Sequence, residues 1–167
     1  MPSIAITVDS KCNASCAHCC FSCTPKSQQM LTDHRVLELV DEAVNNRNVD
    51  EVGISGGEAL LRPKLVFEMI RRIHLVGKRS TLVTNGFWGH NEARARARLL
   101  DLKSAGLSSL TISYDDFHSA YIPVRRIVNI LNANKRVDLR CMVNIAVTRT
   151  HTGDSLISAL GDAALRV

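Results

Sequence analysis

The chain has 167 residues, 46% of them apolar and 22% charged, which is typical of one folded domain and argues against a disordered chain. No apolar run approaches the roughly 18 residues that cross a bilayer, and no signal peptide opens the sequence, so we expect no membrane association and a cytoplasmic location. The net charge of +5 comes from dispersed basic residues with four Phe, two Tyr and one Trp, a pattern that argues against nucleic-acid binding.

Strands and helices are predicted to alternate along the chain. Short runs of apolar and β-branched residues predict strands at 4–8, 51–55, 80–84, 109–113 and 139–147. Apolar residues recur at helical spacing in 37–44, 65–73, 95–105, 124–131 and 156–164. Thr32 or Asp33 suits the N-cap of the first helix, Pro63 the first turn of the second, and Gly106 the end of the third.

The spacing of the strands predicts an α/β fold of five βα units. From residue 51 onward the strand starts are about 30 residues apart, which is the length of one βαβ unit with parallel strands. The strands are apolar on both faces, so we expect helices to cover both faces of the sheet. A closed barrel of eight strands needs about 250 residues. The residues alone therefore leave two architectures, a partial (β/α) barrel and a flat doubly wound sheet.

Chemically suggestive residues follow each predicted strand. Because the carboxyl ends of parallel strands share one side of the sheet, we expect these residues to form one site. They are the cysteines of 12–23 after the first strand, Gly56-Gly57-Glu58 after the second, Thr84 and Asn85 at the third, Ser113 and 114–118 at the fourth, and Asn144 with 149–151 at the fifth.

Five of the six cysteines lie within residues 12–23, and this crowding predicts a metal site. Cys12, Cys16 and Cys19 can ligate three irons of a four-iron cluster and leave the fourth iron open to a ligand. Zinc is the competing metal, and Cys20 or Cys23 would then complete a closed four-thiolate site. The remaining cysteine, Cys141, is interpreted as a small buried hydrophobic residue.

Two of these motifs resemble those of the radical S-adenosylmethionine (SAM) superfamily. Cys12-x3-Cys16-x2-Cys19, with His18 before the last cysteine, resembles the CxxxCxΦC signature, and Gly56-Gly57-Glu58 resembles the GGE motif after strand two. The resemblance extends to about residue 149 and implies a partial (β/α) barrel. It also implies a [4Fe–4S] cluster on the three cysteines, with SAM on the open iron. An external one-electron reductant would then drive cleavage of SAM to a 5′-deoxyadenosyl radical that abstracts hydrogen from the substrate.

The resemblance also implies SAM contacts for particular residues. Gly56 and Gly57 would let the backbone approach the methionyl group closely, and Glu58 would accept from the ammonium. His18 stands at the position usually held by an aromatic ring. Ser113 and Asp115 match the ribose-contacting positions, while Asn144 and Arg149 would reach the adenine and the SAM carboxylate. His118 and His151 could donate protons near the substrate, but they are interpreted as exposed loop histidines, and no residue is assigned to catalysis on the substrate.

The family core has six βα units, whereas this sequence offers five. We therefore expect residues 1–167 to be one radical SAM core domain that is incomplete at its C-terminus, with an exposed edge on the fifth strand. Family analogy favours a peptide substrate, because compact members with cysteines this near the N-terminus often act on peptides. The alternative is a non-catalytic truncated core or a zinc-stabilised metal-binding module.

Overall fold

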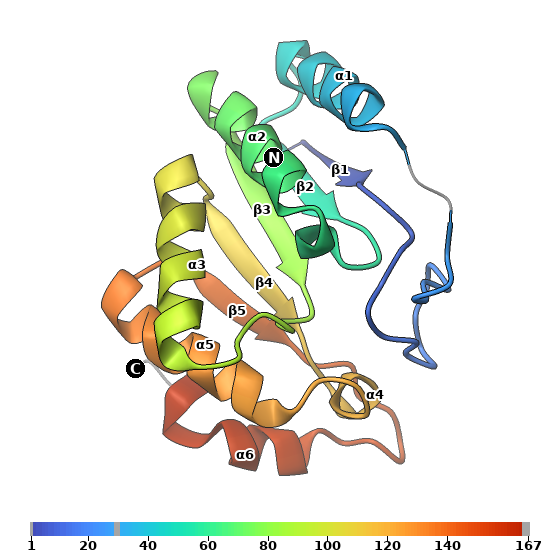
Figure 1. Cartoon of the computed structure of the whole chain (residues 1–167), viewed down its shortest axis with the longest axis vertical. Helices are drawn as coiled ribbons and strands as arrows, with labels where there is room; N and C mark the ends of the chain where they lie inside the picture. The colour runs from blue at the N-terminus through green and yellow to red at the C-terminus, as the bar shows by residue number, and fades with distance from the viewer. Residues whose placement is uncertain (1, 29–30, 165–167) are drawn as a thin grey trace.

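Strands and helices alternate along the chain in the computed structural model, which describes residues 2–28 and 31–164 (Figure 1). The strands are β1 (Ser3–Thr7), β2 (Glu51–Ser55), β3 (Arg79–Thr84), β4 (Ser109–Ser113) and β5 (Cys141–Asn144). The helices are α1 (Asp33–Asn45), the 3-10 turn η1 (Ala59–Leu61), α2 (Pro63–Leu75), α3 (Glu92–Ala105), α4 (Asp116–Ser119), α5 (Val124–Val137) and α6 (Asp154–Ala164). The predicted βα units are all present, and η1 and α4 are additions that the periodicity did not indicate.

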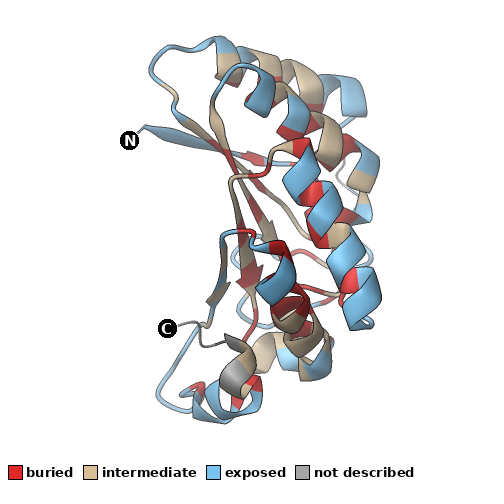
Figure 2. Ribbon diagram, turned by 90° about the vertical axis from the view of Figure 1, so that its left-hand side faces the viewer, coloured by how far each residue is buried: buried red, intermediate tan, exposed pale blue. Residues whose placement is uncertain are grey.

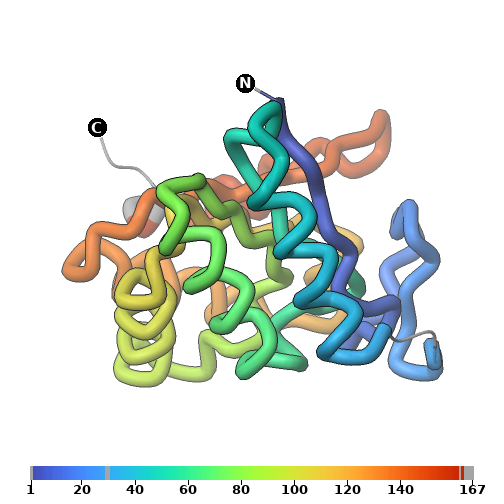
Figure 3. Tube along the Cα trace, turned by 90° about the horizontal axis from the view of Figure 1, so that it is seen from above, coloured from blue at the N-terminus to red at the C-terminus, as the bar shows by residue number. Residues whose placement is uncertain are grey.

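The five strands form one parallel sheet in the order β1-β2-β3-β4-β5. Because parallel crossovers are right-handed, a consecutive strand order places every crossover helix on the same face of the sheet. Figure 2 shows the crossover helices on one side of the strands, and Figure 3 shows α1, α2 and α3 in a row along that side. This arrangement is the open partial barrel, and it excludes the doubly wound alternative.

The main core lies between the sheet and this single layer of helices. One row of apolar side chains crosses all five strands in register, namely Ile6, Ile54, Leu82, Leu110 and Cys141. Along β2, β3 and β4, buried residues alternate with half-buried ones. The expectation that helices cover both faces of the sheet is therefore wrong. The half-buried residues point to the face that no crossover helix covers.

The predicted helix ends agree with the structure. Thr32 caps α1, where its hydroxyl oxygen accepts from the Arg35 amide at 3.2 Å, and Pro63 is the first residue of α2. Gly106 ends α3 with φ of 97°, in the left-handed region that favours glycine. The starts of α1 and α2 and the end of α3 therefore lie where the sequence predicts them.

The fifth strand is shorter than the predicted 139–147. The Asn134 side chain, at the end of α5, donates to the Leu139 carbonyl at 2.8 Å and accepts from the Leu139 amide at 3.1 Å. These bonds hold Leu139 outside the ladder, so pairing begins at Cys141 and ends at Asn144. Within the described residues β5 pairs with β4 alone, and the Met142 side chain on it is 47% exposed. The expected free edge is present on a short strand.

None of the described helices is both long enough and apolar enough to cross a bilayer.

Candidate functional site

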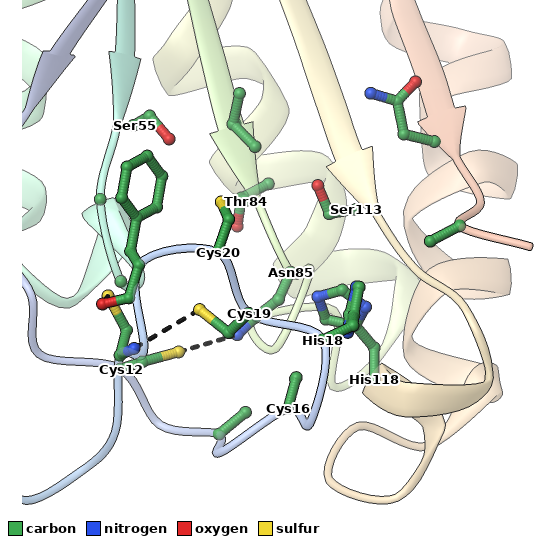
Figure 4. Close-up of a pocket in the computed structure, with 18 of the residues that line it drawn as sticks. Cys12, Cys16, His18, Cys19, Cys20, Ser55, Thr84, Asn85, Ser113 and His118 are labelled. Carbon is green, nitrogen blue, oxygen red and sulfur yellow. Dashed lines mark hydrogen bonds between the residues drawn. The ribbon is translucent and has the colours of Figure 1, made fainter.

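A cavity of about 330 Å³ opens at the carboxyl ends of the strands, between the sheet and the Cys loop, which we define as residues 12–23 (Figure 4). Figure 4 shows labelled cysteines of this loop together with the strand ends that carry Ser55, Thr84 and Ser113. Nine of the residues predicted to contact the cluster or SAM line the cavity: Cys12, Cys16, His18, Cys19, Gly56, Gly57, Ser113, Asp115 and Asn144. Thr84 and Asn85 line it as well, so the fold brings residues from all five predicted turns into one site.

The Cys loop has a small interior of its own. Cys12 and Cys23 are 8% and 3% exposed and pack around Ala14, with Cys16 and Cys19 half-buried against them. This cluster is separate from the main core. The loop places the three cysteines of the signature together, and it places the thiol of Cys23 beside them.

Backbone bonds give the Cys loop its shape. The Cys12 amide donates to the Thr24 carbonyl at 3.1 Å, which closes the base of the loop. Within the loop, the Cys19 amide donates to the Cys16 carbonyl at 3.1 Å and the Ser22 amide to the Cys19 carbonyl at 3.0 Å. These two consecutive turns link Cys16 to Cys19 and Cys19 to Ser22.

Burial makes the thiols weak acids in the metal-free chain. Burial, followed by the neighbouring Cys12, raises the pKa of Cys16 to about 11, and burial with the neighbouring Cys19 raises the pKa of Cys23 to about 11. The pKa of Cys12 is raised as well, chiefly by burial. A metal centre bound among the thiols offsets this effect, because a cation stabilises thiolates and releases their protons. This donor set therefore fits a positively charged iron–sulfur or zinc centre.

Two of the sulfur atoms accept hydrogen bonds from nitrogen (Figure 4). The Cys23 amide donates to the Cys19 sulfur at 3.4 Å, and the Asn85 side-chain amide donates to the Cys12 sulfur at 3.9 Å. Asn85 also donates to the Asn13 side chain at 2.8 Å. Hydrogen bonds of this kind orient metal ligands and tune their donor strength. Asn85 thus lies at the site.

The glycine pair allows β2 to approach the Cys loop closely. The Gly57 amide donates to the Asp9 carbonyl at 2.7 Å, and the Glu58 amide to the Lys11 carbonyl at 3.0 Å. A Cβ atom on Gly57 would lie 2.3 Å from the Lys11 carbonyl oxygen. This distance is well below the 3.0 Å at which a Cβ atom already clashes with its neighbour. The missing side chain at Gly57 thus lets the turn after β2 contact the residues that lead into Cys12.

Glu58 turns into the protein and does not line the cavity. Its carboxylate accepts from the Leu60 amide at 3.0 Å, the Thr84 hydroxyl at 2.9 Å and the Asn85 amide at 2.7 Å. Complete burial raises the pKa of Glu58 to about 7 despite these bonds. The carboxylate therefore joins the turn after β2 to the end of β3, and its predicted contact with the SAM ammonium stays a prediction.

The turn after β4 brings three ionisable residues together. Asp115 accepts from His118 Nδ1 at 2.8 Å through one carboxylate oxygen and lies 3.2 Å from His18 Nε2 through the other. The Asp115 side chain is 3% exposed and that of His118 is 13% exposed. Burial acts to raise the pKa of Asp115, but the hydrogen bonds and charges of the histidines outweigh it and lower the pKa overall. The interpretation of His118 as an exposed loop histidine is therefore wrong.

One part of this arrangement, the N-cap of α4, could have been recognised in the sequence. Asp115 is the N-cap of α4 and accepts from the amides of Phe117 and His118 at 3.0 and 3.1 Å. An aspartate before a short polar stretch is a recognised helix-start pattern. The contact with His18, nearly a hundred residues away, had no such signal.

Arg149 and His151 do not line the cavity. Arg149 is exposed in the segment after β5 and is absent from the cavity walls, so its predicted contact with the SAM carboxylate stays a prediction. His151 is half-buried, with its ring 4.8 Å from that of Phe117. The interpretation of His151 as an exposed loop histidine is therefore wrong.

Comparisons with known proteins identify the family of the chain. The Radical SAM superfamily model matches residues 6–162. The "Putative peptide biosynthesis protein YydG" of Bacillus subtilis is 36% identical over 166 residues, which are 99% of this chain and 52% of that protein. The GTP 3′,8-cyclase of Helicobacter pylori is 29% identical, over 94% of this chain and 50% of the cyclase. The chain thus spans about half the length of the curated relatives it matches.

A solved structure of TYW1 with a lysine-pyruvate adduct bound superimposes on 96% of this chain and 61% of TYW1, with a TM-score of 0.63 and 19% identity, which supports the fold. The family match extends over nearly the whole chain and includes the cysteine and glycine motifs that meet at the cavity. The chain therefore belongs to the radical SAM superfamily, a family of enzymes.

Proposed function

We propose that this domain binds a [4Fe–4S] cluster through Cys12, Cys16 and Cys19, and SAM in the adjoining cavity, and that the protein acts on a peptide. The observation that carries the proposal is that the three thiols share one wall of the cavity to which Gly56 and Gly57 contribute another. The proposed cofactors supply one-electron reductive cleavage of SAM and, through it, abstraction of hydrogen from the substrate.

The chain's own residues would bind and orient the two cofactors and shield them from water. The three cysteines would lose their protons and hold the metal, and Asn85 and the Cys23 amide donate to two of their sulfurs. Ser113 and Asp115 are proposed to contact the ribose, and Asn144 the adenine side. Apolar cavity residues such as Val83, Phe21 and Ala146 would exclude water from the reacting groups. Three adjacent free thiols also suit a reducing compartment such as the cytoplasm.

The peptide substrate is proposed from the relative YydG, whose name refers to peptide biosynthesis. The GTP 3′,8-cyclase supplies the competing substrate class. The two are separated by measuring 5′-deoxyadenosine after anaerobic reconstitution and reduction, with GTP added in one sample and a small peptide encoded beside the gene in the other. A rise with the peptide supports the proposal, and a rise with GTP alone contradicts it.

The cluster assignment predicts that serine at position 12, 16 or 19 abolishes SAM cleavage. Each change removes one of three ligands, and a cluster lacking a ligand is lost or remains incomplete. The measurement is iron and sulfide content together with 5′-deoxyadenosine release, in the presence of SAM and a chemical reductant. Cys20→Ser is the matched control, because Cys20 is an exposed cysteine of the same loop. Full cleavage by Cys16→Ser would refute the assignment.

A second candidate is a closed four-thiolate metal site without catalytic activity. It is favoured by Cys23, whose buried thiol packs against Cys12 and Cys19 and could complete a tetrahedral zinc site. Metal analysis of protein purified without oxygen separates the candidates. About four iron and four sulfide per chain support the cluster, whereas about one zinc without sulfide supports the closed site.

A further inference from the structure

A short segment after β4 contacts the middle of the Cys loop. We call residues 115–121 the α4 segment, because they contain α4 and the residues that flank it. His18 Nε2 lies 3.2 Å from an Asp115 carboxylate oxygen, and the His18 ring stacks on that of Phe117 with centroids 4.5 Å apart and planes inclined by 25°. The Tyr121 hydroxyl donates to the Ser15 carbonyl at 2.8 Å. Three contacts thus join segments about a hundred residues apart in the sequence.

The α4 segment is itself held firmly. Asp115 caps α4, and the His118 ring bonds to the same carboxylate at 2.8 Å. Just outside the segment, the Tyr114 hydroxyl donates to the Ile122 carbonyl at 2.7 Å, and both residues are buried. A segment fixed at both ends can impose its position on a partner that lacks regular structure.

The Cys loop needs such a partner, because the bonds between Cys16, Cys19 and Ser22 are internal to the loop and do not fix this part of it against the sheet. The base is closed between Cys12 and Thr24, and Asn13 is held by Asn85. Residues 15–18, which lead into and out of Cys16, are held by the contacts from the α4 segment. Loss of these contacts would leave Cys16 and Cys19 on a loop free to sample other conformations.

We propose that the α4 segment is a clamp that holds the Cys loop in the conformation that binds metal, with Tyr121 as a positioning residue for Cys16 and Cys19. The inference rests on the proposed function for the identity of the metal, but the clamp itself is a property of the metal-free chain. Ordering the loop before the metal arrives lowers the conformational entropy lost on binding. The clamp therefore favours both uptake and retention of the metal.

The first test is hydrogen exchange of the metal-free chain. Tyr121→Phe keeps the ring and removes the one hydroxyl that contacts Ser15, so amides in 14–20 should exchange roughly two- to tenfold faster, the range that one hydrogen bond corresponds to. Asn129→Ala is the matched control, because Asn129 also donates a single bond, at 2.9 Å, to the carbonyl of Gly89, remote from the loop. Unchanged exchange in Tyr121→Phe, or an equal rise in the control, overturns the clamp.

The second test is the rate at which a chelator removes iron from the reconstituted chain. Tyr121→Phe and Phe117→Leu, which removes the ring stacking and keeps an apolar side chain, should each release iron several-fold faster than Asn129→Ala and the unmodified chain. Equal rates in all four proteins overturn the clamp. If the unmodified chain takes up no iron and sulfide, the proposed function fails, and the exchange measurement still decides whether the clamp exists.

Discussion

Glu58 shows how a residue of a binding motif can have a structural role at the same time. Its carboxylate joins the turn after β2 to the end of β3 through three hydrogen bonds, and it is completely buried. The carboxyl group accepts from the Asn85 amide, and the Asn85 side chain in turn donates to the Cys12 sulfur. A change at Glu58 therefore reaches the metal site through Asn85.

The raised pKa of Glu58 predicts a pH dependence of stability. The folded chain keeps this proton up to about pH 7, whereas the unfolded chain loses it near pH 4.5. The contribution of Glu58 to the free energy of unfolding should therefore be largest below pH 4.5, decrease as the pH rises to about 7, and then level off. Burial of Glu58 accounts for a change on the order of 3 kcal/mol, at about 1.4 kcal/mol per pKa unit.

Urea unfolding of the metal-free, reduced chain at pH 5 and pH 8 measures this dependence. Glu58→Gln cannot ionise, so the difference between the two pH values should be smaller in the variant than in the unmodified chain. Every other ionisable group is the same in both proteins, so the contributions of those groups cancel in the comparison. An equal difference in the two proteins would show that the Glu58 carboxyl group does not titrate in this way.

At the scale of one residue, the sequence identified the cysteines but not their surroundings. The spacing of Cys12, Cys16 and Cys19 confines three thiols to a short loop, which is a local property. The inward turn of Glu58 and the pairing of Asp115 with His18 depend on which side-chain conformations the folded chain allows. Such contacts between distant residues leave no periodic pattern in the sequence.

The turn after β2 is the element that brings the sheet against the Cys loop. Gly57→Ala would place a Cβ atom 2.3 Å from the Lys11 carbonyl oxygen, and the backbone leading into Cys12 would have to move. We expect a loss of about 1–3 kcal/mol in the free energy of unfolding, which is typical of overpacking. We also expect reduced iron uptake, because displacement of Lys11 shifts Cys12.

Gly53→Ala, within β2, is the control for this prediction. Its Cβ would meet the Thr81 hydroxyl at 3.4 Å and the Ala5 side chain at 3.5 Å, which are ordinary contacts. Denaturant unfolding and iron content measured on both variants decide the outcome. Comparable losses in the two variants would mean that the contact with Lys11 has no special role.

The bounds of a strand could be predicted where they depend on its own residues. They could not be predicted where a residue outside the strand bonds to its backbone. The bounds of β2 and β4 agree with the predicted strands, because in each a buried apolar residue alternates with a half-buried one over five residues. The predicted fifth strand was too long, because Asn134 binds Leu139 and keeps it out of the ladder. The order of the strands could not be read from the sequence, because it follows from how the units pack.

At the scale of the whole molecule, the Cys loop and the sheet have separate interiors. The main core includes none of the five cysteines of the loop, and those cysteines that are buried pack among themselves. We therefore expect a variant with serine at 12, 16 and 19 to fold, with a thermal midpoint within a few degrees of the metal-free, unmodified chain. Circular dichroism during heating provides the measurement. Loss of the folded signal in the variant would show that the thiols stabilise the sheet.

The consecutive order of the strands has a consequence for synthesis on the ribosome. Each strand pairs with the one made just before it, so the sheet can extend from β1 one unit at a time as the chain emerges. The α4 segment is made only after β4, so the middle of the Cys loop waits for about a hundred further residues before it is held. The proposed cluster should therefore be inserted only after the first four strands have paired.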